Sequence, residues 1–178
     1  ELDIVSGFHT DPVGLLLSHR ADWAIVSDVE QNDDVLFKPL FSYEMVGICS
    51  KDHPLANKEV WQAEDFAEET WVTYPVPDDM LDLYRQVLKP KGINPPRRTT
   101  ELTIALIQLV ASRRGIATVP YWAALPYLEK GYVVARKITE EGLYSNLYAA
   151  IRKEDANLAY IEDFHQTVKT QSFSTLPG

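Results

Sequence analysis

The sequence predicts an α/β fold, because strand-like and helix-like segments alternate from one end of the chain to the other. Such alternation is typical of domains whose helices cover a sheet of mostly parallel strands. The clearest unit is the segment 102–122, LTIALIQLVASRRGIATVPYW, with the pattern helix, turn, strand, helix. A change of composition at 75–79, PVPDD, predicts a crossing into a second lobe, and the closing strand and helix predict a return. The expected lobes are residues 1–74 plus 148–178, and residues 75–147, with a ligand cleft between them.

The first expected lobe follows from short apolar runs and turn signals. Asp11 followed by Pro12 is an N-cap and first-turn pair, which opens a helix through His19. The strands expected in this part are 2–6, 23–26, 35–40, 43–50 and 70–74, with a turn at 52–55 and a short helix at 63–69.

In the second expected lobe, apolar residues recur at helical spacing from Met80 to Leu88, and the Pro-rich and Gly-rich stretch 90–96 predicts a loop. Residues 102–113 are apolar on nearly every face, which predicts a buried helix that Gly115 can end in a left-handed conformation. A buried strand at 116–119 follows. Pro120 opens another helix, which Pro126 is expected to shorten or kink. The remaining elements are strands at 132–137 and 147–152 and a closing helix with Leu158, Ile161, Phe164 and Val168 on its inward face.

Composition excludes several classes of function. Of 178 residues, 26 are acidic and 17 basic, and the net charge of −9 opposes nucleic-acid binding by this chain, which needs cations against phosphates. A solvated acidic surface accounts for that charge. The single cysteine, Cys49, in an apolar run, supports no disulfide and suits a reducing compartment. No signal peptide or 18-residue apolar span occurs, so we expect a cytoplasmic domain without a membrane partner.

The motifs of catalysis and metal binding are absent from the sequence. No HExxH, CxxC, GxSxG, P-loop or GxGxxG pattern occurs, and the four histidines lie outside metal-ligand spacings. The acidic residues Asp78, Asp79 and Asp82 are interpreted as charges that favour a helix N-terminus rather than as a catalytic cluster. We therefore expect no enzyme activity, no catalytic residues, no metal and no cofactor.

Three predicted helix N-termini follow strands, and each offers unpaired N–H groups to a carboxylate. They lie at residues 10–12, 99–101 and 120–122. Neighbouring aromatic side chains could wall an apolar part of a ligand, or equally pack into a core between lobes. A solvent-facing His9 and an ordinary first-turn Glu101 are the alternatives to polar contacts from these two residues. The candidate ligand-binding residues are Phe8, His9, Tyr74, Thr100, Glu101, Thr103, Pro120, Tyr121 and Trp122.

The chain resembles the effector-binding domain of LysR-type transcriptional regulators along nearly its whole length. The residues that carry the resemblance are ADWAIVSD (21–28), LFKPLFSYEMVGICSKDHPLA (36–56) and RRGIATVP (113–120). The resemblance implies a two-lobed type II periplasmic-binding-protein-like fold with crossover strands and a small effector in the cleft. It also implies a homodimer or tetramer that binds DNA through an N-terminal winged helix-turn-helix absent here, and it implies that the first strand and helix of the effector domain are missing.

Within that family, four segments are similar to the regulators of methionine biosynthesis: SGFHTDP (6–12), TYPV (73–76), LIQLVASRRGIATVPYW (106–122) and GLYSNLYAAIRKED (142–155). This similarity implies homocysteine as the effector, with its carboxylate at the helix N-termini, its ammonium on an acidic side chain and its thiol against the aromatic wall. The alternative function is that of an extracytoplasmic solute-binding protein of the same fold, which takes a small amino acid.

Overall fold

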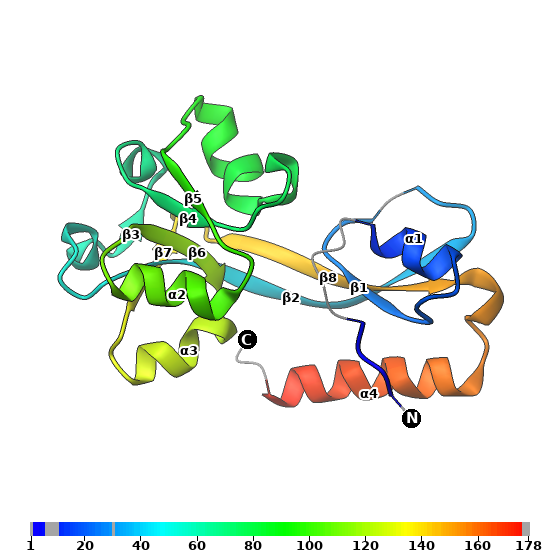
Figure 1. Ribbon diagram of the computed structural model, residues 1–178. Helices are drawn as coiled ribbons and strands as arrows, with labels where there is room; N and C mark the ends of the chain where they lie inside the picture. Colours follow the sequence, from blue (N-terminus) through cyan, green and yellow to red (C-terminus); the bar gives the residue numbers. More distant parts are fainter. Residues whose placement is uncertain (1, 6–10, 30, 176–178) are drawn as a thin grey trace. The chain divides into compact units, whose positions relative to one another are not determined.

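The computed structural model describes residues 2–5, 11–29 and 31–175 (Figure 1). Contacts divide the chain into two units, unit 1 (Glu1–Ser42 and Ser145–Gly178) and unit 2 (Tyr43–Tyr144). The helices and strands, in chain order, are α1 (Pro12–Leu17), β1 (Ala24–Val26), β2 (Val35–Cys49), β3 (Val60–Trp61), β4 (Trp71–Thr73), β5 (Arg97–Thr99), α2 (Thr103–Ala111), β6 (Ile116–Pro120), α3 (Tyr121–Glu129), β7 (Val134–Ile138), β8 (Leu143–Arg152) and α4 (Ala159–Thr175). Short 3-10 helices lie at Pro54–Asn57, Ala63–Phe66, Asp78–Met80, Lys89–Lys91 and Lys153–Asp155, and a π-helical turn at Tyr84–Leu88.

Unit 1 is made from both ends of the chain. β1 pairs antiparallel with β8, so that Ile25 lies opposite Ala149. Two small apolar clusters form its core, one around Leu16 of α1 and one around Ile161 of α4. At the point where β2 and β8 leave the unit, the Ser42 hydroxyl donates a hydrogen bond to Asn146 Oδ1 at 2.5 Å.

Unit 2 contains a mixed sheet with apolar side chains on both faces. β2 pairs antiparallel with β6 and β7, whereas β6, β4 and β5 pair in parallel and β3 pairs in parallel with β7. Because side chains alternate along a strand, Trp71 and Val72 of β4 belong to different cores. The Val72 core is covered by α2 and α3, which pack against β4, β6 and β7 (Figure 1).

The structure confirms the α/β class but not the expectation of mostly parallel pairing. The described strand pairs include both parallel and antiparallel ones. β6 and β7, which follow one another in the chain, both run antiparallel to β2, whereas β6 is parallel to β4. The strand expected at 2–6 is wrong for residues 2–5, which make no strand ladder and leave Leu2 and Ile4 66% and 83% exposed. The two strands expected at 35–40 and 43–50 are one uninterrupted strand, β2, since Pro39 does not break it.

Several element boundaries also differ from those expected. The helix opened by Pro12 ends at Leu17, where Ser18 caps it, rather than at His19. The helix expected at 63–69 is a single 3-10 turn, and the segment after the proline-rich loop contains a strand, β5, that the sequence did not predict. Pro126, which we expected to shorten or kink the helix that follows Pro120, lies inside α3, and this helix ends at Glu129.

The contacts place the boundaries of the two units at 42/43 and 144/145, whereas the sequence suggested 74/75 and 147/148. Residues 43–74 group with unit 2 because the C-terminal half of β2 pairs with β6 and β7, and because β4 lies between β5 and β6.

Candidate functional site

The candidate site lies in unit 2, at the carboxyl ends of the parallel strands β5, β4 and β6. Tyr74 follows β4, Thr100 follows β5, and Pro120 ends β6. The Thr100 N–H donates to the Thr73 carbonyl at 3.0 Å, which continues the pairing of β4 with β5 to this edge. Because parallel strands end on the same side of a sheet, ligands of open α/β sheets bind at such an edge.

The first turn of α2 is joined to the end of β4 by a pair of hydroxyl groups. Tyr74 Oη and Thr103 Oγ1 lie 2.7 Å apart and share a hydrogen bond. Burial raises the pKa of the Tyr74 phenol, against the lowering effect of this hydrogen bond, and so favours the neutral hydroxyl. Leu102 occupies the N-cap position and its side chain cannot accept a hydrogen bond, so the first N–H groups of α2 lack a side-chain cap.

The N-terminus of α3 also lacks a side-chain cap. Pro120 occupies its N-cap position without a side-chain hydrogen bond, and Tyr121 and Trp122 form the first turn. The Trp122 ring lies edge-on to the ring of Tyr43, with centroids 6.4 Å apart. Its indole Nε1 is buried without a hydrogen-bond partner among the described residues.

The third expected helix start differs from these two. The Asp11 carboxylate already accepts a hydrogen bond from the Gly14 N–H at 2.6 Å, so the N-terminus of α1 is capped by its own side chain. α1 belongs to unit 1, and its expected neighbours Phe8 and His9 lie outside the described residues.

The structure therefore brings some of the expected residues together. Tyr74, Thr100 and Thr103 meet at the end of the β4–β5 pair, and the segment Pro120–Trp122 lies at the end of the adjacent strand β6. Glu101 lies between Thr100 and α2 with an exposed side chain. Whether these residues hold a ligand remains a prediction.

Two features of this region did not emerge from the sequence. Tyr43, whose ring contacts Trp122, reaches the site because β2 pairs with β6 in the register Met45 to Pro120. Leu102 and Ile104, expected inside a buried helix, are 61% and 56% exposed. An apolar pattern on every face does not say which turn of a helix extends beyond the sheet that it covers.

Catalytic chemistry has little support in the described residues. Burial raises the pKa of the Cys49 thiol to about 11, although Arg136 opposes this effect, so the thiol is a poor nucleophile. The acidic residues Asp78, Asp79 and Asp82 form ion pairs with Arg97, Lys89 and Arg85, respectively.

Within the described ranges, no cluster of three His, Cys, Asp or Glu side chains could hold a metal ion. None of the helices described there has the length and apolarity to cross a bilayer.

An α/β architecture of two units linked by β2 and β8 places this protein in the class of type II periplasmic-binding-protein-like domains. Residues 1–172 match the family model of the LysR substrate binding domain, and the chain belongs to this family.

Named relatives extend this result. The chain is 85% identical to the HTH-type transcriptional regulator MetR of Haemophilus influenzae over 178 residues, which are 100% of this chain and 58% of that protein. It is 36% identical to MetR of Salmonella typhimurium over 177 residues, 99% of this chain and 56% of that protein. The chain thus spans little more than half the length of the curated relatives that it matches.

Solved structures agree with the fold. The regulatory domain of MetR, a LysR family regulator from N. meningitidis, matches with a TM-score of 0.91 and 66% identity, over 100% of this chain and 82% of that one. The effector binding domain of QuiR in complex with shikimate, 22% identical, matches in fold with a TM-score of 0.76, over 93% of this chain and 78% of that one. These relatives do not favour the alternative of an extracytoplasmic solute-binding protein.

Proposed function

We propose that this chain is the effector-sensing domain of a LysR-type regulator of methionine biosynthesis, and that its effector is homocysteine. The observation that carries the proposal is the pair of uncapped N-termini, of α2 and α3, at one edge of the parallel strands of unit 2. Unpaired N–H groups and the positive end of the helix dipole favour a bound carboxylate. The 85% identity to a MetR protein supports methionine metabolism as the source of that carboxylate.

The hydroxyl pair gives this site a second polar contact. Tyr74 and Thr103 share one hydrogen bond, and in this proposal their hydroxyl groups contact a ligand oxygen. Trp122 and Tyr43 offer ring surface to a thiol or a methylene chain. In this proposal Glu101 contacts the ammonium end of the ligand. His9 and Phe8, which the sequence also suggested as ligand contacts, lie outside the described residues.

The same proposal covers the longer regulator. Its DNA binding resides in a winged helix-turn-helix outside these 178 residues, it assembles as a homodimer or tetramer, and it works in the cytoplasm without enzyme activity. The names of the relatives, which are HTH-type transcriptional regulators, support the DNA-binding role. The acidic excess of this chain is consistent with an interface to DNA located elsewhere.

A thermal-unfolding series tests the effector. We expect homocysteine to raise the unfolding midpoint in a saturable way, and methionine and cysteine to raise it less at equal concentration. At about 100 times Kd, binding stabilises the folded state by roughly 2.7 kcal/mol, which corresponds to several degrees for a domain of this size. The proposal fails if homocysteine leaves the midpoint unchanged or acts no better than cysteine.

A matched pair of variants tests the position of the site. Tyr74→Phe removes only the hydroxyl that contacts Thr103, and Tyr160→Phe removes a hydroxyl from an exposed ring on α4 of unit 1. We expect Tyr74→Phe to weaken homocysteine about fivefold, the effect of one hydrogen bond, and Tyr160→Phe to leave its affinity unchanged. Equal affinities of both variants, measured by titration calorimetry, would place the ligand elsewhere.

A further inference from the structure

Glu44 of β2 is a partly buried acidic residue whose charge the fold does not compensate. Its carboxylate makes no hydrogen bond or ion pair with any other described residue. The other partly buried acidic residues of unit 2 each have a cationic partner: Asp65 pairs with Lys58, Glu69 with His53 and Asp82 with Arg85. A carboxylate that loses part of its hydration without such a partner costs free energy. Glu44 is therefore a group that a bound cation would stabilise.

The face of the sheet on which Glu44 lies follows from its neighbours in β2. Met45 packs against the core on one face of the sheet, whereas Val46 belongs to the core on the other face, which α2 and α3 cover. Because side chains alternate along a strand, Glu44 lies on the same face as Val46. Tyr74 and Tyr121 pack against this second core, so Glu44 is on the side of the sheet where the candidate site is formed.

The register of β2 with β6 brings Glu44 to the edge of the sheet that carries this site. Met45 lies opposite Pro120, the last residue of β6, so Glu44 lies beside Tyr121, the first residue of α3. Neighbouring strands are about 5 Å apart. The Glu44 carboxylate is thus within reach of a group bound at the N-terminus of α3, which has no side-chain cap.

We propose that Glu44 binds the α-ammonium group of the effector and thereby restricts the site to α-amino acids. This inference rests on the proposed function, which places the effector carboxylate at the N-termini of α2 and α3. The ammonium and the carboxylate of an α-amino acid are attached to one carbon atom, so the acceptor for the ammonium must lie beside the carboxylate site, as Glu44 lies beside α3. Glu101 is exposed, and water screens its charge, so it contributes less.

The same carboxylate disfavours ligands that lack an amino group. A simple carboxylic acid bound at α3 would bring a second negative charge next to Glu44, with no ammonium between them. Specificity of this kind comes from an unpaired charge against the wrong ligand as much as from a contact with the right one.

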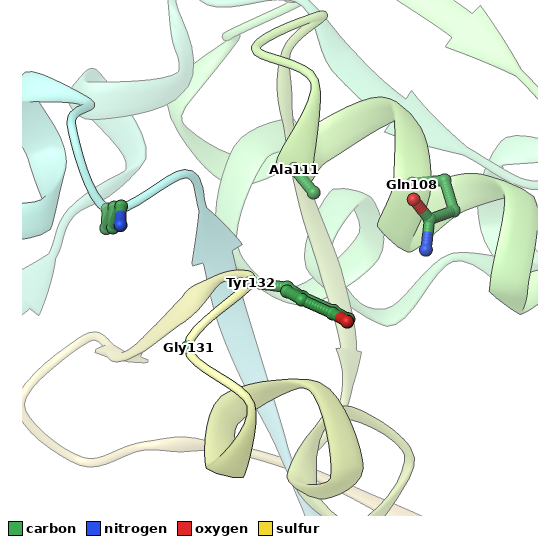
Figure 2. Close-up of a pocket in the computed structure, with 5 residues that line it drawn as sticks. Gln108, Ala111, Gly131 and Tyr132 are labelled. Atoms are coloured by element: carbon green, nitrogen blue, oxygen red, sulfur yellow. The ribbon is translucent and has the colours of Figure 1, made fainter.

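Two hollows elsewhere in unit 2 are less suited to an amino acid. One, of about 360 Å³, lies at the other end of α2, and its lining contains Lys51 and no carboxylate (Figure 2). The other, of about 520 Å³, has Glu59 in its lining together with the cations Arg136 and Lys137. Neither lining offers an ammonium group a carboxylate without nearby cations.

The test compares two ligands that differ only in the amino group: homocysteine and 4-mercaptobutyrate. In titrations followed by the amide chemical shifts of the 178-residue chain, we expect Glu44→Gln to weaken homocysteine about tenfold, the effect of one hydrogen bond to a charged group. The same variant should bind 4-mercaptobutyrate as well as the wild type does, or more tightly, because this ligand has no ammonium. Glu59→Gln, which removes an exposed carboxylate next to the other hollow, is the matched control and should leave both affinities unchanged.

The outcomes separate the role of Glu44 from the identity of the effector. If Glu44→Gln weakens both ligands equally, or neither, Glu44 does not bind the ammonium. If the wild type binds methionine but not homocysteine, the effector proposed above is wrong, and the same comparison between methionine and 4-(methylthio)butyrate decides the role of Glu44. If homocysteine, methionine and cysteine all fail to bind, both proposals fall.

The unfolding midpoint without ligand separates binding from folding. Glu44→Gln removes a charge that has no partner among the described residues, so its midpoint should equal or exceed that of the wild type. A lower midpoint would show that Glu44 stabilises the fold, and would overturn the inference that its partner is a ligand.

Discussion

Each of the two units of this protein is stabilised in a different way. Unit 2 contains the large buried aromatic side chains Trp61, Phe66 and Trp71, and its net charge is small, with 14 acidic and 12 basic residues. Unit 1 has smaller described clusters and carries 12 acidic against 5 basic residues. At its centre lies Arg152, a buried arginine in a unit with a large acidic excess.

Arg152 joins several segments of unit 1, whose described apolar clusters are small. Its guanidinium donates to the carbonyls of Leu16 and Ala21 at 2.8 and 2.6 Å, and to the carboxylates of Asp22 and Asp155 at 2.7 and 2.5 Å. The side chain thereby joins the end of α1, the start of the β1 strand region and the end of β8. The comparison teaches that one buried charged group can join several segments of a fold when most of its donors have acceptors.

The strongest test of unit 2 is the backbone at Gly115, the residue before β6. Its φ is +146°, and a Cβ there would lie 2.2 Å from the Thr70 carbonyl oxygen. We expect Gly115→Ala to destabilise the protein by about 4 kcal/mol, because neither backbone can move without breaking the β4–β6 pairing. Gly92→Ala, at φ +68° with open space around it, should cost only about 1 kcal/mol. Urea unfolding measures both, and similar losses would show that backbone overlap is not what constrains Gly115.

The corresponding test of unit 1 is Arg152→Met. The loss leaves two carbonyls and a mostly buried carboxylate without their donor, so we expect a destabilisation of about 3 kcal/mol. Hydrogen exchange should rise in α4 and β1 more than in α2 and β6, since the defect lies in unit 1. Lys153→Met, one residue further along and exposed, is the control. A uniform increase of exchange in both units would contradict their separate stabilisation.

A third test uses pH, because unit 1 buries His165 on α4 with only 4% of the residue exposed. Burial, and then the charges of Lys38 on β2 and Lys169, lower the pKa of His165 below its ordinary value, although Glu162 acts in the opposite direction. The unfolded chain therefore binds a proton more readily than the folded one. The contribution of neutral His165 to stability is complete above about pH 6.5 and is lost as the pH falls through the folded pKa.

We thus expect the unfolding midpoint to fall between pH 7 and pH 5, and the fall to be smaller in His165→Gln. His19→Gln removes an exposed histidine of the same unit, paired at 4.0 Å with Glu154, and should leave the pH dependence close to that of the wild type. The same slope in wild type and His165→Gln would mean that other groups cause the acid sensitivity.

The smallest effect is expected at the surface of unit 2. Lys89 and Asp79 form an ion pair at 2.8 Å with both side chains exposed, and this hydrogen bond lowers the pKa of Asp79 and raises that of Lys89. Water and salt screen such pairs, so Lys89→Gln should leave the free energy of unfolding unchanged within error. A clear decrease in the free energy of unfolding of Lys89→Gln, measured by urea titration at low salt, would show that this exposed ion pair does stabilise the fold.

Sequence predicted the centre of unit 2 better than its edge. The helix, strand and helix of residues 102–122 occur with boundaries shifted by one or two residues, because their apolar runs and the Pro signal agree. The left-handed residue after α2 is Arg113, with φ +59°, and not Gly115 as expected. β5 was not predicted, because its residues Arg97, Arg98 and Thr99 are all exposed and do not alternate between apolar and polar side chains. Only its pairing with β4 makes this segment a strand.

The candidate site shows the same limit. Patterns indicated which residues begin the helices and, correctly, that Asp11 caps α1, but not that Leu102 and Pro120 would leave α2 and α3 without a side-chain cap. Nor could they show the contact of Tyr74 with Thr103, residues 29 positions apart, because it depends on how β4 and β5 align. Local chemistry is visible in a sequence, whereas contacts across a sheet require the register.

The division of the chain also bears on the order of events during synthesis. Unit 2 is one continuous stretch, whereas unit 1 needs residues from both ends of the chain. As the chain leaves the ribosome, unit 2 is complete while β8 beyond Tyr144, with Arg152, and α4 are still to be made. Domains fold as units during translation, so unit 2 can fold first and the N-terminal half of unit 1 must wait for the last strand and helix. During that interval the carbonyls of Leu16 and Ala21 have no guanidinium to bind, and the apolar side chains of Val13 and Leu16 lack Ala150 of β8, so this segment exposes apolar surface until β8 is made.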